Sequence, residues 1–340
     1  MNIAVLGTGS WGTALAKVLA DNNHQVRIWG RNVKVIEEIN QHHVNTMYIK
    51  KGEIPENISA SSDVSYVLDQ AQMIVIVVPT QAIRQVCQQV ASFLEKMDTP
   101  PVIVHATKGL DVQTYQRVSE VIQEELNQVY TQPIAVLSGP SHAEEVMVED
   151  ITTVTAACED LDVAKKVQDA FINHYFRVYT NTDIIGVELG GALKNIIALA
   201  SGVLTGSGYG DNSRAALMTR GLAEITRLGV KLGADPLTFS GLSGVGDLFV
   251  TCTSPHSRNF QAGYLLGQGK TLNQVEEEVQ MIVEGISTTK VARDLAYQHQ
   301  LEMPITFGLY DLIYEGKTVS ETVQKLMARE RKQEENIEHY

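Results

Sequence analysis

The stretch Ile3–Ala20, IAVLGTGSWGTALAKVLA, decides the fold of the N-terminal half. Three glycines, Gly7, Gly9 and Gly12, have the spacing GxGxxG between a short apolar run, Ile3–Leu6, and a helical pattern. In that context the first glycine permits a tight turn, the second lets a pyrophosphate approach the backbone, and the third lets the helix pack on the strand. The pyrophosphate would lie at the helix N-terminus, so the stretch predicts a dinucleotide-binding βαβ unit.

The next strand is predicted at Gln25–Trp29, and the residues after it bear on the choice of dinucleotide. NAD-selective proteins usually carry Asp or Glu at this place, whereas this sequence has Arg31. A guanidinium cannot accept hydrogen bonds from ribose hydroxyls, but it can pair with a 2′-phosphate and stack on the adenine. Arg31 therefore favours NADPH and leaves additional use of NADH open. The alternative is that Arg31 is a solvated surface residue.

The composition excludes several classes of protein. With 340 residues, of which 44% are apolar and 20% charged, the chain is long enough for two globular domains. Its formal net charge of −13 argues against nucleic acid or an anionic membrane surface as the main partner. Three cysteines without CxxC spacing indicate reduced thiols, and the histidines lack the spacing of a metal site. We expect no leader, no apolar run of membrane-spanning length, and a cytoplasmic location.

Two domains of different character are predicted, residues 1–185 and residues 186–340. The first alternates helical patterns with mostly continuous apolar runs, which suit strands covered on both faces of a doubly wound α/β sheet. Turn residues such as Lys108-Gly109 and Gly139-Pro140-Ser141 end several of these runs, at the edge where such sheets bind ligands. The second domain has long helical patterns without convincing strands and is predicted to be all-α. The remaining runs are Gln72–Thr80, Pro101–Gly109, Pro133–Ala143 and Ile151–Cys158.

One lysine interrupts an otherwise apolar helical segment in the second domain. Lys194 follows Gly190 and Gly191, which we expect to leave room for a ligand. A buried lysine has a lowered pKa because desolvation disfavours its charge, which suits a proton donor and acceptor near neutral pH. The alternative is a lysine whose stem reaches the surface from a helix end.

A second unusual stretch runs from Gly241 to Gly263. Asp247 and Thr251 are four residues apart and would lie on one side of a helix, where a carboxylate could hold the ammonium of Lys194. Ser257 is typical of a helix N-cap, so the helix-end amides with Arg258 and Asn259 would form an anion site for a phosphate-bearing substrate. The alternative is an ordinary capped surface helix.

These motifs together resemble the NAD(P)-dependent glycerol-3-phosphate dehydrogenase family over nearly the whole chain. The resemblance lies in GTGSWGTALA, VPTQAIR, KGL, GPSHAEEV, ELGGALKN, GVGDLFVTC and SRNF, in the family's order and spacing. It implies a catalytic lysine at Lys194, with Lys108 and Asp247 also catalytic. The substrate pocket that it implies comprises Lys108, Gly139, Ser141, Asn195, Asp247, Thr251, Ser257, Arg258 and Asn259. The cofactor residues that it implies are Gly7, Gly9, Ser10, Trp11, Gly12, Arg31, Lys108, Ala143, Arg258, Val283 and Glu284.

The implied reaction is reversible hydride transfer between NADPH or NADH and dihydroxyacetone phosphate, giving sn-glycerol 3-phosphate for phospholipid synthesis. Lys194 would donate a proton to the forming alkoxide, steadied by Asp247, while Lys108 adds positive charge that stabilises the oxyanion. The resemblance also suggests a homodimer, with a small phosphorylated triose as substrate, no metal and no membrane insertion.

Three other functions remain as alternatives. Other β-hydroxyacid dehydrogenases share this architecture, but their partnering asparagine usually lies one helical turn after the lysine, where this chain has Ala198. UDP-sugar dehydrogenases need a nucleophilic cysteine, for which Cys252 is the only candidate near the site. A non-catalytic NADPH-binding sensor would leave the lysine, the aspartate and the anion site without a role.

Overall fold

The computed structural model describes residues 1–97, 99–279 and 282–330. The chain forms two compact units. The first comprises Met1–Asp111 and Gln116–Ile184, and the second comprises Val112–Tyr115 with the chain from Ile185 onward. The sequence places its domain boundary between residues 185 and 186, and the last ten residues of the predicted second domain lie outside the described residues.

The first unit is built on an eight-stranded sheet with the order β3-β2-β1-β4-β5-β6-β7-β8. All neighbouring strands are parallel except β6 and β7, which are antiparallel. The order reverses between β1 and β4, which is where doubly wound sheets open a crevice for ligands. The predicted α/β class is therefore confirmed. The strands are β1 Asn2–Leu6, β2 Gln25–Trp29, β3 Ile58–Ser61, β4 Met73–Ile76, β5 Val102–His105, β6 Ala135–Ser138, β7 Thr152–Ala157 and β8 Phe176–Asn181.

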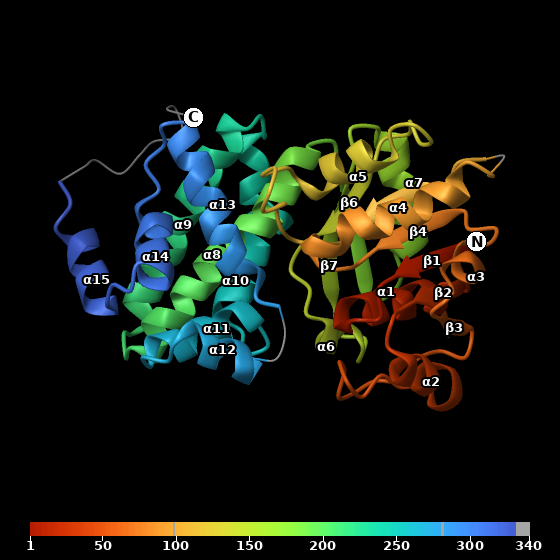
Figure 1. Cartoon of the computed structure of the whole chain (residues 1–340), viewed down its shortest axis with the longest axis horizontal. Coiled ribbons are helices and arrows are strands. Elements are labelled where there is room, and N and C mark those ends of the chain that lie inside the picture. Colours follow the sequence, from red (N-terminus) through yellow and green to blue (C-terminus); the bar gives the residue numbers. More distant parts are fainter. Residues whose placement is uncertain (98, 280–281, 331–340) are drawn as a thin grey trace. The chain divides into compact units, whose positions relative to one another are not determined.

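Helices cover both faces of this sheet (Figure 1). Alternate residues of β1 enter different cores, with Ile3 and Val5 in one and Ala4 and Leu6 in the other. One core is completed by α1, α2, α6 and α7, the other by α3, α4 and α5. Burial on both faces explains the continuous apolar runs of the sequence. The helices are α1 Ser10–Asp21, α2 Val33–His42, α3 Val64–Leu68, η1 Thr80–Ala82, α4 Ile83–Leu94, α5 Val118–Leu126, α6 Ala143–Val146 and α7 Leu161–Phe171.

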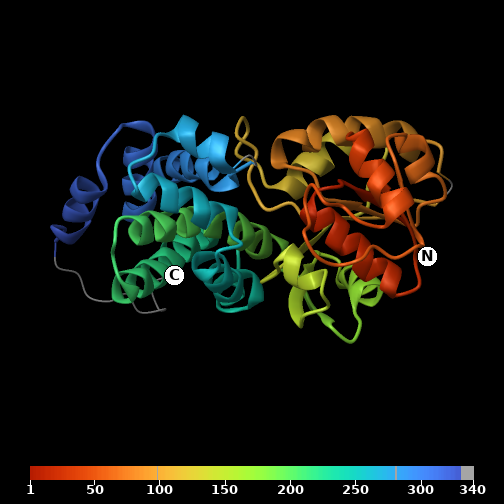
Figure 2. The same cartoon turned by 90° about the horizontal axis from the view of Figure 1, so that it is seen from below.

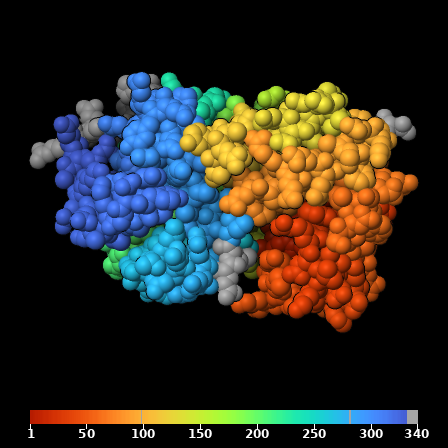
Figure 3. Space-filling view, in the orientation of Figure 1, coloured from red at the N-terminus to blue at the C-terminus, as the bar shows by residue number. Residues whose placement is uncertain are grey.

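Within its described residues, the second unit has helices as its regular elements and no strand, as predicted (Figure 2). In the space-filling view the segments from α11 onward, cyan to blue, form most of the visible surface of this unit (Figure 3). Its elements are α8 Ile184–Gly206, α9 Asp211–Lys231, η2 Pro236–Ser240, the π-helical turn η3 Leu242–Gly246, α10 Asp247–Thr253, α11 Arg258–Gly267, α12 Leu272–Val279, α13 Glu284–Gln298, α14 Pro304–Tyr314 and α15 Val319–Met327.

Helix α8 corrects one expectation from the sequence. We expected no apolar run of membrane-spanning length, yet α8 has 23 residues and is long and apolar enough to cross a membrane by length and composition. Of its most apolar window, 94% is buried inside the structure. A helix that is apolar on all sides is needed in the centre of a helical domain, and α8 fills that place in the second unit.

Candidate active site

The glycine loop between β1 and α1 has the geometry that GxGxxG requires. Gly7 has a φ of +133°, and a Cβ there would lie 2.4 Å from the carbonyl oxygen of Val77. A Cβ on Gly12 would lie 1.9 Å from the carbonyl oxygen of Gly7, so both positions exclude a side chain. A Cβ on Gly9, in contrast, meets nothing within 4 Å. Gly9 is also the N-cap of α1 and contributes no side-chain cap, and a helix N-terminus is a favourable place for an anion.

Two further residues bear on this loop. Asn45, only 3% exposed, donates from Nδ2 to the carbonyl oxygen of Thr8 and to Oγ1 of Thr13, both at 2.9 Å, and so ties the loop to the segment after α2. The sequence carries no signal for this role of Asn45. The buried Nε1 of Trp11 has no hydrogen-bond partner within the described part of the chain. A ligand oxygen or an ordered water molecule can supply the partner that such a buried donor needs.

Arg31 lies two residues after the end of β2. A Cβ on Gly30 would lie 2.3 Å from Oγ1 of Thr8, so the chain passes tightly against the glycine loop before it reaches Arg31. The Arg31 side chain is exposed, and Asn32 caps α2 by accepting from the N–H of Lys34 at 3.0 Å. The open side of Gly9, the uncapped helix, the Trp11 donor and a cation after β2 together fit a phosphorylated dinucleotide.

Lys108 lies three residues beyond the end of β5, in the first unit. Its Nζ donates to the carbonyl oxygen of Gly139 at 2.9 Å, and Oγ of Ser141 donates to the same oxygen at 2.9 Å. Gly139 has a φ of +145°, which favours glycine, and Ala143 begins α6. Since β5 and β6 are parallel neighbours, Lys108 and the Gly139 turn share the carboxyl edge of the sheet.

Lys194, in the second unit, is buried and paired. Its Nζ lies 2.5 Å from Oδ1 of Asp247 and 2.6 Å from Oγ1 of Thr251. Lys194 is 6% exposed and Asp247 0%. The Lys194 side chain therefore does not reach the surface, which argues against the alternative of a lysine extending to solvent from a helix end. The Thr251 hydroxyl donates to the carbonyl oxygen of Asp247 at 2.6 Å, which leaves its oxygen to accept from the ammonium. The three side chains form a proton-holding group in a site from which water is largely excluded.

Close packing of α8 on the η3–α10 segment brings this group together. A Cβ on Gly190 would lie 2.3 Å from the carbonyl oxygen of Ser243. Gly190 and Ser243 each precede a member of the Lys194–Asp247 pair by four residues, so contact at one turn sets the pair at the next. From the sequence we expected Gly190 to leave room for a ligand. In the structure this space is filled by the backbone of Ser243.

Cys252 is the next residue after Thr251, in surroundings that disfavour its thiolate. Its side chain is 0% exposed, and burial is the main cause that raises the pKa of its thiol to about 12. A thiol with such a pKa supplies almost no thiolate at neutral pH. The structure thus argues against the double oxidation for which a cysteine is needed.

A network of amides links three helices near Lys194. Nδ2 of Asn259 donates to Oδ1 of Asn195 at 2.9 Å, and the backbone N–H of Gly285 donates to Oδ1 of Asn259 at 2.9 Å. Ser257 is the N-cap of α11 and accepts from the N–H of Phe260, as predicted from its sequence. Arg258 is the first residue of α11, and Val283 and Glu284 are the N-cap and the first residue of α13.

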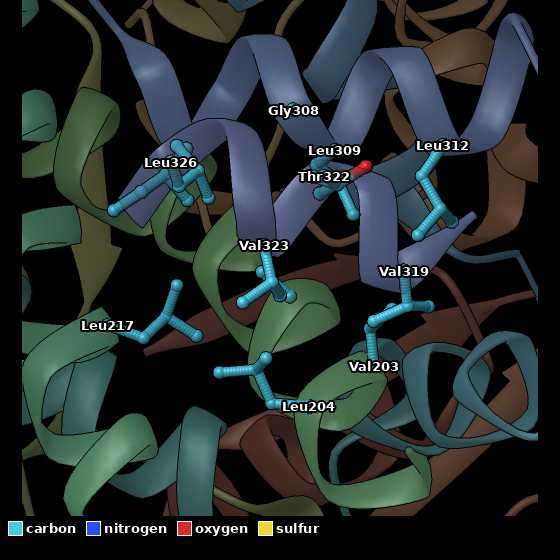
Figure 4. A pocket seen from close by; sticks show the side chains of 12 residues that line it. Val203, Leu204, Leu217, Gly308, Leu309, Leu312, Val319, Thr322, Val323 and Leu326 are labelled. Atoms are coloured by element: carbon cyan, nitrogen blue, oxygen red, sulfur yellow. The ribbon is translucent and has the colours of Figure 1, made fainter. Parts of the chain in front are cut away.

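The second unit also contains a partly open apolar pocket of about 50 Å³ between α8, α9, α14 and α15 (Figure 4). Its lining has no ionisable side chain, so it has no group for acid–base chemistry. The lining residues are Ala200, Val203, Leu204, Leu217, Ile305, Gly308, Leu309, Leu312, Val319, Thr322, Val323 and Leu326.

Comparison with known proteins agrees with this geometry. Residues 2–164 match the model of the NAD-dependent glycerol-3-phosphate dehydrogenase N-terminus, and residues 183–324 match that of its C-terminus. The chain belongs to the NAD(P)-dependent glycerol-3-phosphate dehydrogenase family. A curated glycerol-3-phosphate dehydrogenase [NAD(P)+] from Enterococcus faecalis is 56% identical, covering 98% of this chain and 97% of that protein. One from Streptococcus thermophilus is 55% identical with the same coverage.

Solved structures of glycerol-3-phosphate dehydrogenases are also similar. The crystal structure from Coxiella burnetii has a TM-score of 0.90 at 38% identity, covering 96% of this chain and 98% of that one. A D-mandelate dehydrogenase structure, at 12% identity and a TM-score of 0.63, shares the fold alone. As a member of the glycerol-3-phosphate dehydrogenase family, the chain is an NAD(P)-dependent oxidoreductase that acts on a CH–OH group of a small phosphorylated substrate.

Proposed function

We propose that this chain reversibly reduces dihydroxyacetone phosphate to sn-glycerol 3-phosphate with Lys194 as general acid, and as general base in the oxidation. The observation that carries the proposal is the buried Lys194–Asp247–Thr251 group, in which an ammonium is held 2.5 Å from a carboxylate. Proton transfer by a positioned side chain contributes roughly 10²–10⁴-fold to a rate. The relatives named as glycerol-3-phosphate dehydrogenases support the choice of substrate.

The first unit binds the coenzyme in this proposal. The residues that we propose for it in this unit are Gly7, Gly9, Ser10, Trp11, Gly12, Arg31, Lys108 and Ala143. The N-terminus of α1 binds the pyrophosphate, and Trp11 supplies its unpartnered donor. Arg31 pairs with a 2′-phosphate, so NADPH is preferred over NADH. The nicotinamide, when bound, supplies or accepts the hydride.

The second unit binds most of the substrate. Asp247 and Thr251 keep Lys194 aimed and charged, so that its proton passes to the alkoxide oxygen as that oxygen gains charge. Arg258, Asn259 and the first amides of α11, capped by Ser257, hold the phosphate, which turns remote binding energy into orientation at the carbonyl. Asn195 completes this part of the site. We propose Lys108, Gly139 and Ser141 as the substrate residues of the first unit.

The cellular setting follows from the same proposal. sn-Glycerol 3-phosphate is the backbone of glycerophospholipids, so we assign the reaction to phospholipid synthesis in the cytoplasm. We assign a homodimer through the second unit, with no nucleic acid partner. Light scattering coupled to size-exclusion chromatography measures the dimer directly, and a mass of one chain would contradict it.

The test is a spectrophotometric assay of dihydroxyacetone phosphate reduction by the full chain, run with NADPH and with NADH. Lys194→Ala should abolish turnover while leaving coenzyme binding intact, as measured by quenching of tryptophan fluorescence. Lys290→Ala, an exposed lysine on α13, is the matched control and should retain turnover. Wild-type protein that binds NADPH but reduces no triose phosphate would overturn the enzyme assignment and favour a sensor.

A further inference from the structure

The peptide group between Thr8 and Gly9 has a fixed direction in the glycine loop. Nδ2 of Asn45 donates to the carbonyl oxygen of Thr8 at 2.9 Å. This peptide bond is trans, so the N–H of Gly9 points away from Asn45. Among the described residues no acceptor receives this N–H. The N–H of Gly9 is therefore a donor for a ligand at the N-terminus of α1.

Gly9 itself does not hold this direction. A Cβ at this position would meet nothing within 4 Å, so no packing contact fixes the residue. Glycine adopts positive φ as readily as negative φ, and the peptide could turn over at little cost. Its carbonyl oxygen would then face the ligand and repel an anion. The direction of this peptide thus decides whether the loop attracts a pyrophosphate, and it must be set from outside the glycine motif.

The side chain of Asn45 fits this task in one orientation only. The carbonyl oxygen of Thr8 can only accept, so the NH₂ group of Asn45 must face it. The second hydrogen of the same nitrogen goes to Oγ1 of Thr13 in α1, at 2.9 Å. Oδ1 of Asn45, in contrast, is buried and has no partner in the described ranges of the chain. A buried acceptor without a partner is unfavourable, so we attribute the choice of asparagine here to its two donors.

Asn45 is firmly placed by its own segment. Its carbonyl oxygen accepts from the N–H groups of Tyr48 at 3.2 Å and Ile49 at 2.9 Å. The N–H and the hydroxyl of Thr46 donate to the carboxylate of Glu38 in α2, at 2.9 Å and 2.7 Å. Ile49 is 5% exposed and belongs to the core between α1, α2 and the sheet. The amide that holds Thr8 is therefore anchored on α2 and on this core.

We propose that Asn45 is a positioning residue for the coenzyme, which fixes the Thr8–Gly9 peptide with its N–H directed to the pyrophosphate. This inference rests on the proposed function and adds to it a residue outside the glycine motif. The pyrophosphate is common to NADPH and NADH, whereas only NADPH carries the 2′-phosphate. Asn45 thus governs the affinity for both coenzymes alike, while Arg31 governs the choice between them.

The decisive variant is Asn45→Ala, studied by isothermal titration calorimetry of the full chain with NADPH and with NADH. We expect Kd to rise by the same factor for both coenzymes, about tenfold, because one hydrogen bond to a charged group is lost. KM for each coenzyme should rise likewise, with kcat at saturating coenzyme unchanged. Thr13→Val keeps the shape of the side chain and the donor to Thr8 but removes the second partner of Nδ2. We expect it to raise both Kd values by about threefold.

Asn57→Ala is the matched control, at the opposite end of α1. Nδ2 of Asn57 also holds two backbone carbonyl oxygens, those of Ala20 at 3.0 Å and of His24 at 3.1 Å. Like Asn45→Ala, this variant should lower the melting temperature, but it should bind both coenzymes with wild-type affinity. If Asn45→Ala does not fold, Thr13→Val decides alone.

Three results would overturn the proposal: wild-type affinity for both coenzymes in the Asn45 and Thr13 variants, a loss confined to NADPH, or an equal loss in Asn57→Ala. The titration needs no turnover, so the two proposals fail separately. A wild type that binds NADPH but reduces no triose phosphate would contradict the proposed function and leave the role of Asn45 in coenzyme binding intact.

Discussion

The ammonium nitrogen of Lys194 lies 2.5 Å from a carboxylate oxygen of Asp247, and both side chains are almost entirely excluded from solvent. Two buried charges in contact stabilise each other only if both remain, and removal of one typically leaves several kcal/mol of uncompensated desolvation. The folded protein therefore depends on keeping both charges. The Thr251 hydroxyl beside the ammonium gives the pair a hydrogen-bonded arrangement that suits proton transfer.

Removal of the Asp247 charge should impair the reaction as well as the fold. We expect Asp247→Asn, which keeps the shape and an acceptor, to lower kcat by about 10²–10³-fold because the ammonium loses its orienting charge. Steady-state kinetics with saturating coenzyme measures this. Thr253→Ala, at an exposed position of the same helix, is the control and should stay within about threefold of wild type. An Asp247→Asn enzyme as active as Thr253→Ala would show that the pair has no catalytic part.

Gly190 should be sensitive to a single added methyl group. A Cβ there would lie 2.3 Å from the carbonyl oxygen of Ser243, so Gly190→Ala must push the π-helical turn away from α8. We expect a loss of about 1–3 kcal/mol in the free energy of unfolding and a fall in kcat, since the Lys194–Asp247 contact is one turn away. Gly210→Ala, where a Cβ meets nothing within 4 Å, is the control for both measurements. An unchanged kcat in Gly190→Ala would show that the contact between Gly190 and Ser243 does not affect catalysis.

The sequence predicts those features that depend on local spacing. The glycine loop, the strand Gln25–Trp29 and the Ser257 cap are each set by a few consecutive residues, and the structure has all three. Strands β3 and β8 were missed. β3 is only ISAS, which is short and half polar, and β8 alternates buried and exposed residues at the edge of the sheet, so neither forms a continuous apolar run.

Features that depend on distant residues escape such prediction. Asn195, Asn259 and Gly285 are separated by 64 and 26 residues, and only the packing of α8, α11 and α13 joins them. The sequence names both asparagines but carries no signal for the N–H of Gly285. Gly190 was misread for the same reason, because the backbone that fills its space comes from Ser243.

Arg31 should set the choice of coenzyme. We expect Arg31→Asp to weaken NADPH binding by at least about tenfold, because an attractive charge on the 2′-phosphate becomes repulsive, while NADH binding changes little. Fluorescence titration with each coenzyme measures both affinities. Lys34→Asp is the control, since it makes the same change of charge at an exposed site in the first turn of α2. Equal losses for NADPH and NADH, or equal effects of the two variants, would contradict a specific role of Arg31.

Glu224 should make the stability of the second unit depend on pH. Its carboxylate accepts from the N–H groups of Ile305 and Thr306 and from the Thr306 hydroxyl, and so caps α14 from α9. Burial outweighs these hydrogen bonds and raises the pKa of Glu224 from 4.5 to about 6. The folded state therefore holds the proton more tightly than the unfolded state. Its contribution is fully present below pH 4.5 and is lost as pH rises through 6, a change of about 2 kcal/mol.

Denaturant unfolding of the wild type and of Glu224→Gln, followed by helical circular dichroism from pH 4.5 to 7.5, tests this. Both tryptophans, Trp11 and Trp29, lie in the first unit, so their fluorescence would not report on Glu224. The difference in unfolding free energy between the two proteins removes the titration of all other groups. We expect this difference to shift against the wild type by about 2 kcal/mol as pH rises, mostly between pH 4.5 and 6. A difference that is flat, or that shifts in favour of the wild type, would mean that Glu224 is already ionised at pH 4.5 in the folded protein because the hydrogen bonds at the start of α14 outweigh its burial.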